Sequence, residues 1–175
     1  TGSVAVEIAG LSETVHVYAV ERKPEAVELL RKNREHFHMD NMEIIEALAP
    51  EGLEELPVPT HAFIGGSGGR LMDILQTLYR KNPHMRIVIN AISMETIAEL
   101  QEVLEAFPVE DEEILQMQVN RVKKLGSYHL PQAENPVWIC SFTFREGETG
   151  SMNKVKKALL TEEENGNRKN GEVQR

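Results

Sequence analysis

The sequence contains a single cysteine, Cys140, among 175 residues. One cysteine cannot form a disulfide within the chain, so the fold must depend on its core, as in most proteins of a reducing cytosol. Because Cys140 lies in an apolar run, we expect it to be a packed core residue. No apolar run reaches the roughly 20 residues that a membrane-spanning helix needs, and we recognise no signal peptide. We therefore predict a cytoplasmic protein that does not contact a membrane.

Positive charge is also scarce, because 19 Lys and Arg stand against 28 Asp and Glu, for a net charge of −9. Affinity for nucleic acid depends largely on contacts between cations and phosphates, so this balance disfavours a nucleic-acid-binding protein. A small anionic molecule bound by a few local cations remains compatible with it. The six histidines show no spacing typical of metal ligands, since His36 and His38, two residues apart, would not face together on a helix. We expect no metal site.

Helix-like and strand-like apolar patterns alternate along the chain. Helices are expected at 4–9, 24–37, 71–78 and 93–107, and strands at 15–20, 42–47, 86–90, 114–122 and 137–144, with a further strand that ends at 63–64. Pro24 suits a first helical turn and Ser93 suits a helix N-cap. No crossover helix fits between the last two strands, so we expect them to pair antiparallel. The pattern predicts a doubly wound α/β sheet with an antiparallel last strand.

The spacing of apolar residues also predicts which side of the first two helices faces the core. In the first helix Val4, Ile8 and Leu11 share one face, and in the second Leu30 and Phe37 do, so we expect these side chains to point inward. From 145 to 175 glycine and asparagine separate charged residues, and we expect a polar, mostly disordered tail.

One stretch, His-Ala-Phe-Ile-Gly-Gly-Ser-Gly-Gly at 61–69, joins an expected strand to an expected helix. Leu71, Ile74, Leu75 and Leu78 follow it with the spacing of one helix face. Glycine lets the backbone adopt positive φ and lets a ligand approach the main chain closely. Ligands of open α/β sheets bind outside the carboxyl ends of the strands, where this loop would lie. Four glycines exceed what one turn requires, so we predict a ligand-facing loop.

Two segments resemble motifs of the class I S-adenosylmethionine-dependent methyltransferases. Thr1-Gly2-Ser3 resembles the end of their first glycine-rich loop, and Val17-Tyr18-Ala19-Val20-Glu21-Arg22 resembles the motif whose acid binds the ribose hydroxyls. The resemblance implies a Rossmann-like methyltransferase domain over 1–144. Because the chain begins without Met and within this motif, we expect the domain to be N-terminally truncated and its first strand to be missing from this chain.

The glycine loop narrows the resemblance. Together with Ile89-Asn90-Ala91, Val119-Asn120-Arg121, Lys124-Leu125-Gly126-Ser127-Tyr128 and Asn135-Pro136-Val137, the segment from Phe63 to Gly69 is similar to the decarboxylating precorrin methyltransferases of cobalamin biosynthesis. The resemblance implies methylation of precorrin-6B, or its cobalt form, at carbon 15 with loss of carbon dioxide from the ring C acetate. It implies S-adenosylmethionine as methyl donor, a tetrapyrrole substrate and a homo-tetramer. In some members a C-5 precorrin methyltransferase domain is fused upstream, and the sequence leaves open which form this chain represents.

The resemblance also implies functional roles for individual residues, and for each of them a purely structural role is the alternative. Cofactor contacts are implied for Thr1, Gly2, Glu21, Ala49 and Gly65, and substrate contacts for Gly66, Ser67, Gly68, Gly69, Arg70, Asn90, Arg121 and Tyr128. Lys123, Lys124 and His129 are further cations near the last of these. The structural alternative for Glu21 is an acid at a helix N-terminus, and for each cation a solvated surface charge. The family has an acid where Leu48 stands, so the adenine contact that the resemblance still implies is one through the backbone of Ala49.

Three other functions compete with this interpretation. A methyltransferase for another small molecule or for RNA would share the fold, although the acidic charge disfavours RNA. An NAD-dependent dehydrogenase would also place an acid at Glu21, but the two glycine-containing segments disfavour it. A non-catalytic, truncated domain that assembles with pathway enzymes is the remaining alternative.

Overall fold

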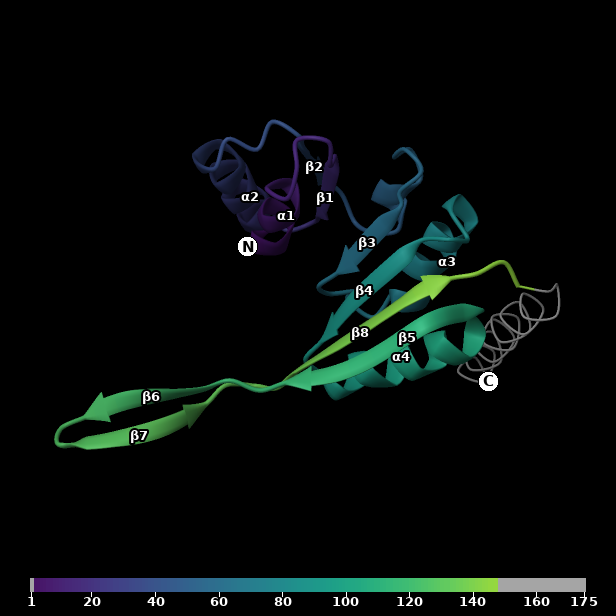
Figure 1. The fold of residues 1–175 in the computed structure, drawn as a ribbon. Coiled ribbons are helices and arrows are strands. Elements are labelled where there is room, and N and C mark those ends of the chain that lie inside the picture. The colour runs from purple at the N-terminus through teal and green to yellow at the C-terminus, as the bar shows by residue number, and fades with distance from the viewer. Residues whose placement is uncertain (1, 148–175) are drawn as a thin grey trace, which may run out of the picture. The chain divides into compact units, whose positions relative to one another are not determined.

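The computed structural model describes residues 2–147 (Figure 1). The chain divides into two compact units, Thr1–Pro59 with Asp73–Lys81, and Thr60–Met72 with Asn82–Arg175. Thr1 and most of the predicted tail lie outside the described residues. Among the helices of the described part, none has the length and apolar character that a membrane span requires.

Helices and strands alternate through most of the chain, which confirms the predicted α/β class. Their order is α1 (Ser3–Ala9), β1 (Val17–Glu21), α2 (Pro24–His36), β2 (Met42–Glu46), the 3-10 turn η1 (Glu51–Leu53), β3 (His61–Ile64), α3 (Leu71–Lys81), β4 (Arg86–Ala91), α4 (Met94–Ala106), β5 (Val109–Met117), β6 (Asn120–Leu125), β7 (Tyr128–Ala133) and β8 (Val137–Phe144). Pro24 lies in the first turn of α2, and the Ser93 hydroxyl accepts a hydrogen bond from Thr96 N at the start of α4, as the sequence predicts.

In the first unit, α1 and α2 pack on the parallel pair β1–β2. Val17 lies opposite Met42 and Glu21 opposite Glu46, so the carboxyl ends of the two strands are side by side. Val6, Ala9, Leu30 and Met42 form the buried cluster that joins the helices to the strands. Burial of apolar side chains is the main stabilising contribution to such a unit. The cluster therefore places Glu21 at an edge that a small core holds in position.

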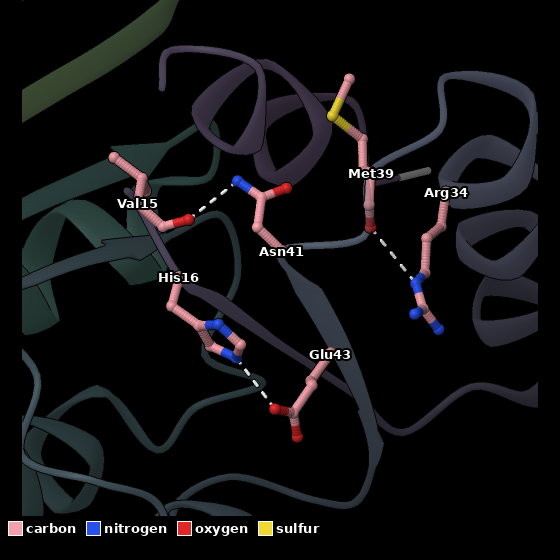
Figure 2. A network of polar contacts seen from close by, with 6 residues as sticks. All are labelled: Val15, His16, Arg34, Met39, Asn41 and Glu43. Atoms are coloured by element: carbon pink, nitrogen blue, oxygen red, sulfur yellow. Dashed lines mark hydrogen bonds and ion pairs between the residues drawn. The ribbon is translucent and has the colours of Figure 1, made fainter. Parts of the chain in front are cut away.

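A polar network fixes where β1 begins (Figure 2). The Asn41 Nδ2 group donates to the carbonyls of Ala9, Ser12 and Val15, at 2.9, 3.2 and 2.8 Å. His16 Nε2 lies 2.8 Å from Glu43 Oε1 on the neighbouring strand. Because these contacts join the end of α1 to the starts of both strands, they set the strand register that ends at Glu21.

The second unit is built on a four-stranded sheet in the order β3-β4-β8-β5. β3 and β4 are parallel, whereas β8 runs antiparallel to both β4 and β5. This arrangement confirms the predicted antiparallel last strand. Side chains alternate along β4, where Ile87 and Ile89 are buried, and the core continues through Leu100 and Val103 of α4.

The connection between β5 and β8 corrects a prediction. The sequence indicated one strand over 114–122 and then a connection without a helix, but β5 spans Val109–Met117 and a β-hairpin, β6–β7, follows it. This hairpin projects beyond the four-stranded sheet (Figure 1). Its strands were missed because a two-sided exposed ribbon has no buried face and thus no strict apolar alternation.

The predicted inward face of α1 was wrong, and that of α2 was partly wrong. In α1 the buried residues are Val6 and Ala9, whereas Leu11 is 77% exposed. In α2 Leu30 is buried as expected, but Val27 accompanies it and Phe37 is 51% exposed. α1 has only seven residues, and in so short a helix several assignments of the inward face fit the same apolar residues. The face of α3 was predicted correctly, since Leu71, Ile74, Leu75 and Leu78 are all buried.

Candidate functional site

Glu21 ends β1 and its carboxylate is held by the backbone of the next segment. Its Oε1 atom accepts hydrogen bonds from Arg22 N at 2.8 Å and Lys23 N at 2.9 Å. Lys23 is the N-cap of α2 and supplies no side-chain cap of its own. Glu21 therefore fulfils the structural role of an acid at a helix N-terminus. Within residues 2–147 no hydrogen bond joins its Oε2 atom to another residue, so that oxygen retains its capacity to accept.

The loop after β2 is hydrogen-bonded to the backbone of Glu21. Ala47 N donates to Glu21 O at 3.1 Å, and Gly52 N donates to Leu48 O at 2.9 Å. A Cβ on Gly52 would approach Ala47 Cβ to 2.6 Å, so only glycine fits here. The turn is thus packed against the strand ends with Ala49, which is partly buried, inside it. The first unit brings Glu21 and the Ala49 loop together, as the two predicted cofactor contacts require.

Gly2 precedes α1 with φ of 69°, a left-handed conformation that favours glycine. A Cβ at this position would overlap the Leu30 side chain of α2. Packing alone therefore explains why Gly2 is glycine, and its cofactor role stays a prediction. Thr1 lies outside the described residues.

In the second unit the glycine loop follows β3 as a tight turn. Arg70 N donates to Ser67 O at 3.3 Å, and the two central residues, Gly68 and Gly69, have φ of 62° and 81°. Positive φ at both central positions is the mark of a turn that requires glycine or asparagine. The structure thus accounts for two of the four glycines through backbone conformation alone.

The other two glycines have no such explanation. Gly65 and Gly66 are both exposed, and neither is among the described glycines with positive φ. A Cβ on Gly66 would meet no atom within 4 Å, and one on Gly65 would meet only the Phe63 ring, at 3.2 Å. Neither turn geometry nor close packing requires glycine at position 66. An open main chain at the carboxyl end of a strand suits approach by a ligand.

Asn90 lies at the same edge of the sheet as this loop. In the parallel pair β3–β4, Ile64 is opposite Ile89, so Gly65 and Asn90 follow side by side. The Ser67 hydroxyl donates to Glu99 Oε2 of α4 at 3.2 Å, and Arg70 is half-buried. Sequence reasoning missed Glu99, which lies 32 residues from Ser67 in a stretch where no motif marks it. Most of the predicted substrate residues are therefore gathered at one edge.

Arg121 and Tyr128 lie elsewhere, on the hairpin β6–β7. Tyr128 is 72% exposed, and Arg121 Nε pairs with Glu134 Oε1 at 2.8 Å. The neighbouring cations Lys123, Lys124 and His129 are exposed on the same hairpin. The ion pair of Arg121 joins the start of β6 to the residue that follows β7. The substrate role of Arg121 and Tyr128 stays a prediction.

Cys140 is fully buried in β8, which confirms that it is a core residue. Burial, reinforced by the negative charge of Glu112 and opposed by Arg86, raises the pKa of the Cys140 thiol to about 11. A thiol of this kind is protonated at neutral pH and is a poor nucleophile. In the described part of the chain no three His, Cys, Asp or Glu side chains gather as metal ligands would.

Comparison with known proteins gives consistent matches across the described units. The family model for the precorrin methyltransferase domain matches residues 1–143. The probable cobalt-precorrin-6B C(15)-methyltransferase (decarboxylating) of Methanothermobacter thermautotrophicus is 36% identical over 139 residues, covering 78% of this chain and 71% of that protein. The cobalt-precorrin-6B C(15)-methyltransferase (decarboxylating) of Salmonella typhimurium is 30% identical over 140 residues, covering 79% and 72%.

A solved structure shows the same similarity in three dimensions. The precorrin-6y C5,15-methyltransferase of Geobacter metallireducens matches with a TM-score of 0.74 and 34% identity, over 81% of this chain and 75% of that one. The region that the family model matches includes the carboxyl ends of β1 and β3 and the glycine loop.

Proposed function

The chain belongs to the precorrin methyltransferase domain family, and we propose that residues 1–144 act as its catalytic domain on precorrin-6B or cobalt-precorrin-6B. Family membership confirms the predicted class I methyltransferase fold and an S-adenosylmethionine-dependent methyltransferase activity. The reaction is methylation at carbon 15 with loss of the ring C acetate carboxylate as carbon dioxide. The observation that carries it is the similarity to relatives named for that reaction at 30% and 36% identity.

The first unit supplies a fitting contact for the methyl donor. When bound, S-adenosylmethionine supplies an electrophilic methyl group on its sulfonium. Two vicinal ribose hydroxyls are hydrogen-bond donors, and a carboxylate already fixed through Oε1 by two backbone amides is oriented to accept from them. Because that orientation exists before binding, little conformational entropy is lost when the contact forms. We assign ribose binding to Glu21 and an adenine contact to the backbone of Ala49.

The second unit supplies the substrate contacts in this proposal. A flat macrocycle that binds against the glycine loop would be obstructed by side chains on it. The exposed main chain at Gly65 and Gly66 leaves that approach open. Asn90 and Arg70 lie at the same edge, where Arg70 can pair with a peripheral carboxylate. The protein then acts mainly by positioning, because the conjugated tetrapyrrole itself supplies and accepts the electrons.

We expect that incubation with precorrin-6B and methyl-deuterated S-adenosylmethionine yields a product with one labelled methyl group gained and one carbon dioxide lost. High-resolution mass spectrometry of the product checks both changes, with S-adenosylhomocysteine in place of the methyl donor as the control. A labelled product that keeps its carboxylate would contradict the decarboxylating assignment. Binding of the donor without turnover would favour another small-molecule substrate, and absence of both would favour the non-catalytic alternative.

We also propose that the protein assembles as a homo-oligomer through the hairpin. Large apolar side chains are exposed along it and the adjoining strand, at Leu115, Met117, Val119, Val122, Leu125, Tyr128 and Leu130. Three of its side chains are cationic, Arg121, Lys123 and Lys124, in a chain whose net charge is −9. An exposed apolar ribbon of this kind marks an interaction site, and the opposite charge favours another copy of the acidic chain as its partner. The resemblance favours four copies.

Val122→Lys is expected to convert the oligomer to smaller species, because it buries a charge in the proposed interface. Val58→Lys is the matched control, since these valines are 66% and 68% exposed and Val58 lies in the first unit. Sedimentation velocity at several concentrations measures the change. An unchanged sedimentation coefficient for Val122→Lys, or an equal change for both variants, would overturn the hairpin assignment.

A further inference from the structure

Among residues 2–147, Glu99 is the one side chain outside the glycine loop that forms a side-chain hydrogen bond with the loop's serine. It lies in the middle of α4, which is capped at Ser93 and packs against β4. The Ser67 hydroxyl donates to Glu99 Oε2 at 3.2 Å in a partly buried setting. The second oxygen, Oε1, lies 3.8 Å from where a Cβ on Gly69 would be. Both carboxylate oxygens therefore face the same short loop.

The composition of the loop leaves its backbone much conformational freedom. The backbone hydrogen bond that closes its turn, from Arg70 N to Ser67 O, is long at 3.3 Å. Four of the six residues from Gly65 to Arg70 are glycine, the residue with the greatest backbone freedom. A Cβ on Gly66 would meet no atom within 4 Å, so packing does not restrict this position. An acceptor on a rigid helix therefore helps to select one loop conformation, because a glycine segment on its own samples many.

The same hydrogen bond defines what Ser67 can offer to a ligand. A hydroxyl has one proton, and here Glu99 accepts it, so the Ser67 oxygen presents only lone pairs. Its remaining capacity is to accept a hydrogen bond. A carboxylate behind it also disfavours an anionic group at that point. The loop therefore suits a donor such as a ring N–H, while peripheral carboxylates pair with cations.

We propose that Glu99 is a positioning residue for the methyl transfer, acting through Ser67 to hold the glycine loop in its ligand-ready conformation. This inference rests on the proposed function. Glu99→Ala removes the acceptor, whereas Glu99→Gln keeps an amide oxygen in the same place. Glu102→Ala is the matched control, because Glu102 is an exposed glutamate of the same helix. Alanine is a good helix former, so both alanine variants should leave α4 intact.

Two measurements separate this role from a merely structural one. Hydrogen exchange of the amides at 65–70, followed by mass spectrometry, is expected to accelerate in Glu99→Ala and to stay near wild type in Glu99→Gln and Glu102→Ala. Steady-state turnover of precorrin-6B is expected to show a kcat about 10- to 100-fold lower for Glu99→Ala, since misplacing a binding element costs that much. Glu99→Gln should recover most of the rate. Ser67→Ala should match Glu99→Ala, and the double variant should be no slower than either.

Two results would overturn the proposal. One is unchanged loop exchange in Glu99→Ala. The other is a Glu99→Gln variant as slow as Glu99→Ala with wild-type loop exchange, which would mean that the charge acts directly instead of through Ser67. The exchange experiment needs no turnover. If wild-type protein fails to convert precorrin-6B while Glu99→Ala still loosens the loop, the proposed reaction fails and the anchoring role stands.

Discussion

Replacing Glu21 by alanine is expected to weaken S-adenosylmethionine binding by about 1–3 kcal/mol, because a charged hydrogen-bond acceptor for the ribose is lost. Each 1.4 kcal/mol corresponds to about a tenfold change in the dissociation constant. Isothermal titration calorimetry measures the dissociation constant of S-adenosylmethionine for the variant and the wild type. The same variant also removes the acceptor for Arg22 N and Lys23 N, so the free energy of unfolding should fall by about 1 kcal/mol, as for loss of a helix cap.

Two companion variants separate these effects. Glu21→Gln keeps an oxygen for the backbone amides but has no negative charge, so we expect helix stability close to wild type with reduced cofactor affinity. Glu25→Ala removes an exposed acid from the first turn of the same helix and should leave affinity unchanged. Wild-type affinity in Glu21→Ala would restrict Glu21 to its structural role at the start of α2.

Gly66→Ala is expected to lower kcat/KM for precorrin-6B by about 10- to 100-fold, since a methyl group on the open main chain would displace a ligand that approaches it. The substitution should leave the melting temperature unchanged, because the added Cβ meets no atom within 4 Å and the position does not require positive φ. The combination of intact stability and impaired turnover is what a ligand-facing glycine predicts. Thermal unfolding by circular dichroism and steady-state kinetics provide the two measurements.

Gly68→Ala is the contrasting variant in the same loop. With φ of 62°, alanine there should cost about 1–2 kcal/mol of stability through backbone strain alone. If Gly66→Ala turned over precorrin-6B at the wild-type rate, the main chain at Gly66 would not face substrate. In that case the glycine content of the loop would reflect only its turn.

Much of the fold could be predicted because its information is local. Strand and helix periodicities, a proline in the first turn of α2 and a capping serine at α4 each lie within one element. The long apolar face of α3 was assigned correctly, whereas the seven-residue α1 was turned to the wrong face. A short helix contains too few turns to define its inward stripe. The hairpin β6–β7 was missed because none of its residues is buried in the described structure.

The candidate site divides in the same way. By itself the sequence determined the α/β class, the strand-loop-helix at the glycine segment, the acid at the end of β1 and the resemblance to precorrin methyltransferases, because all of these are patterns within short stretches. Only the tertiary structure decided that two backbone amides hold the Glu21 carboxylate, that the turn itself requires Gly68 and Gly69 but not Gly66, and that Glu99 holds Ser67 from 32 residues away. The reason is physical: such contacts depend on how a folded core places distant backbone segments, and no local periodicity encodes that placement.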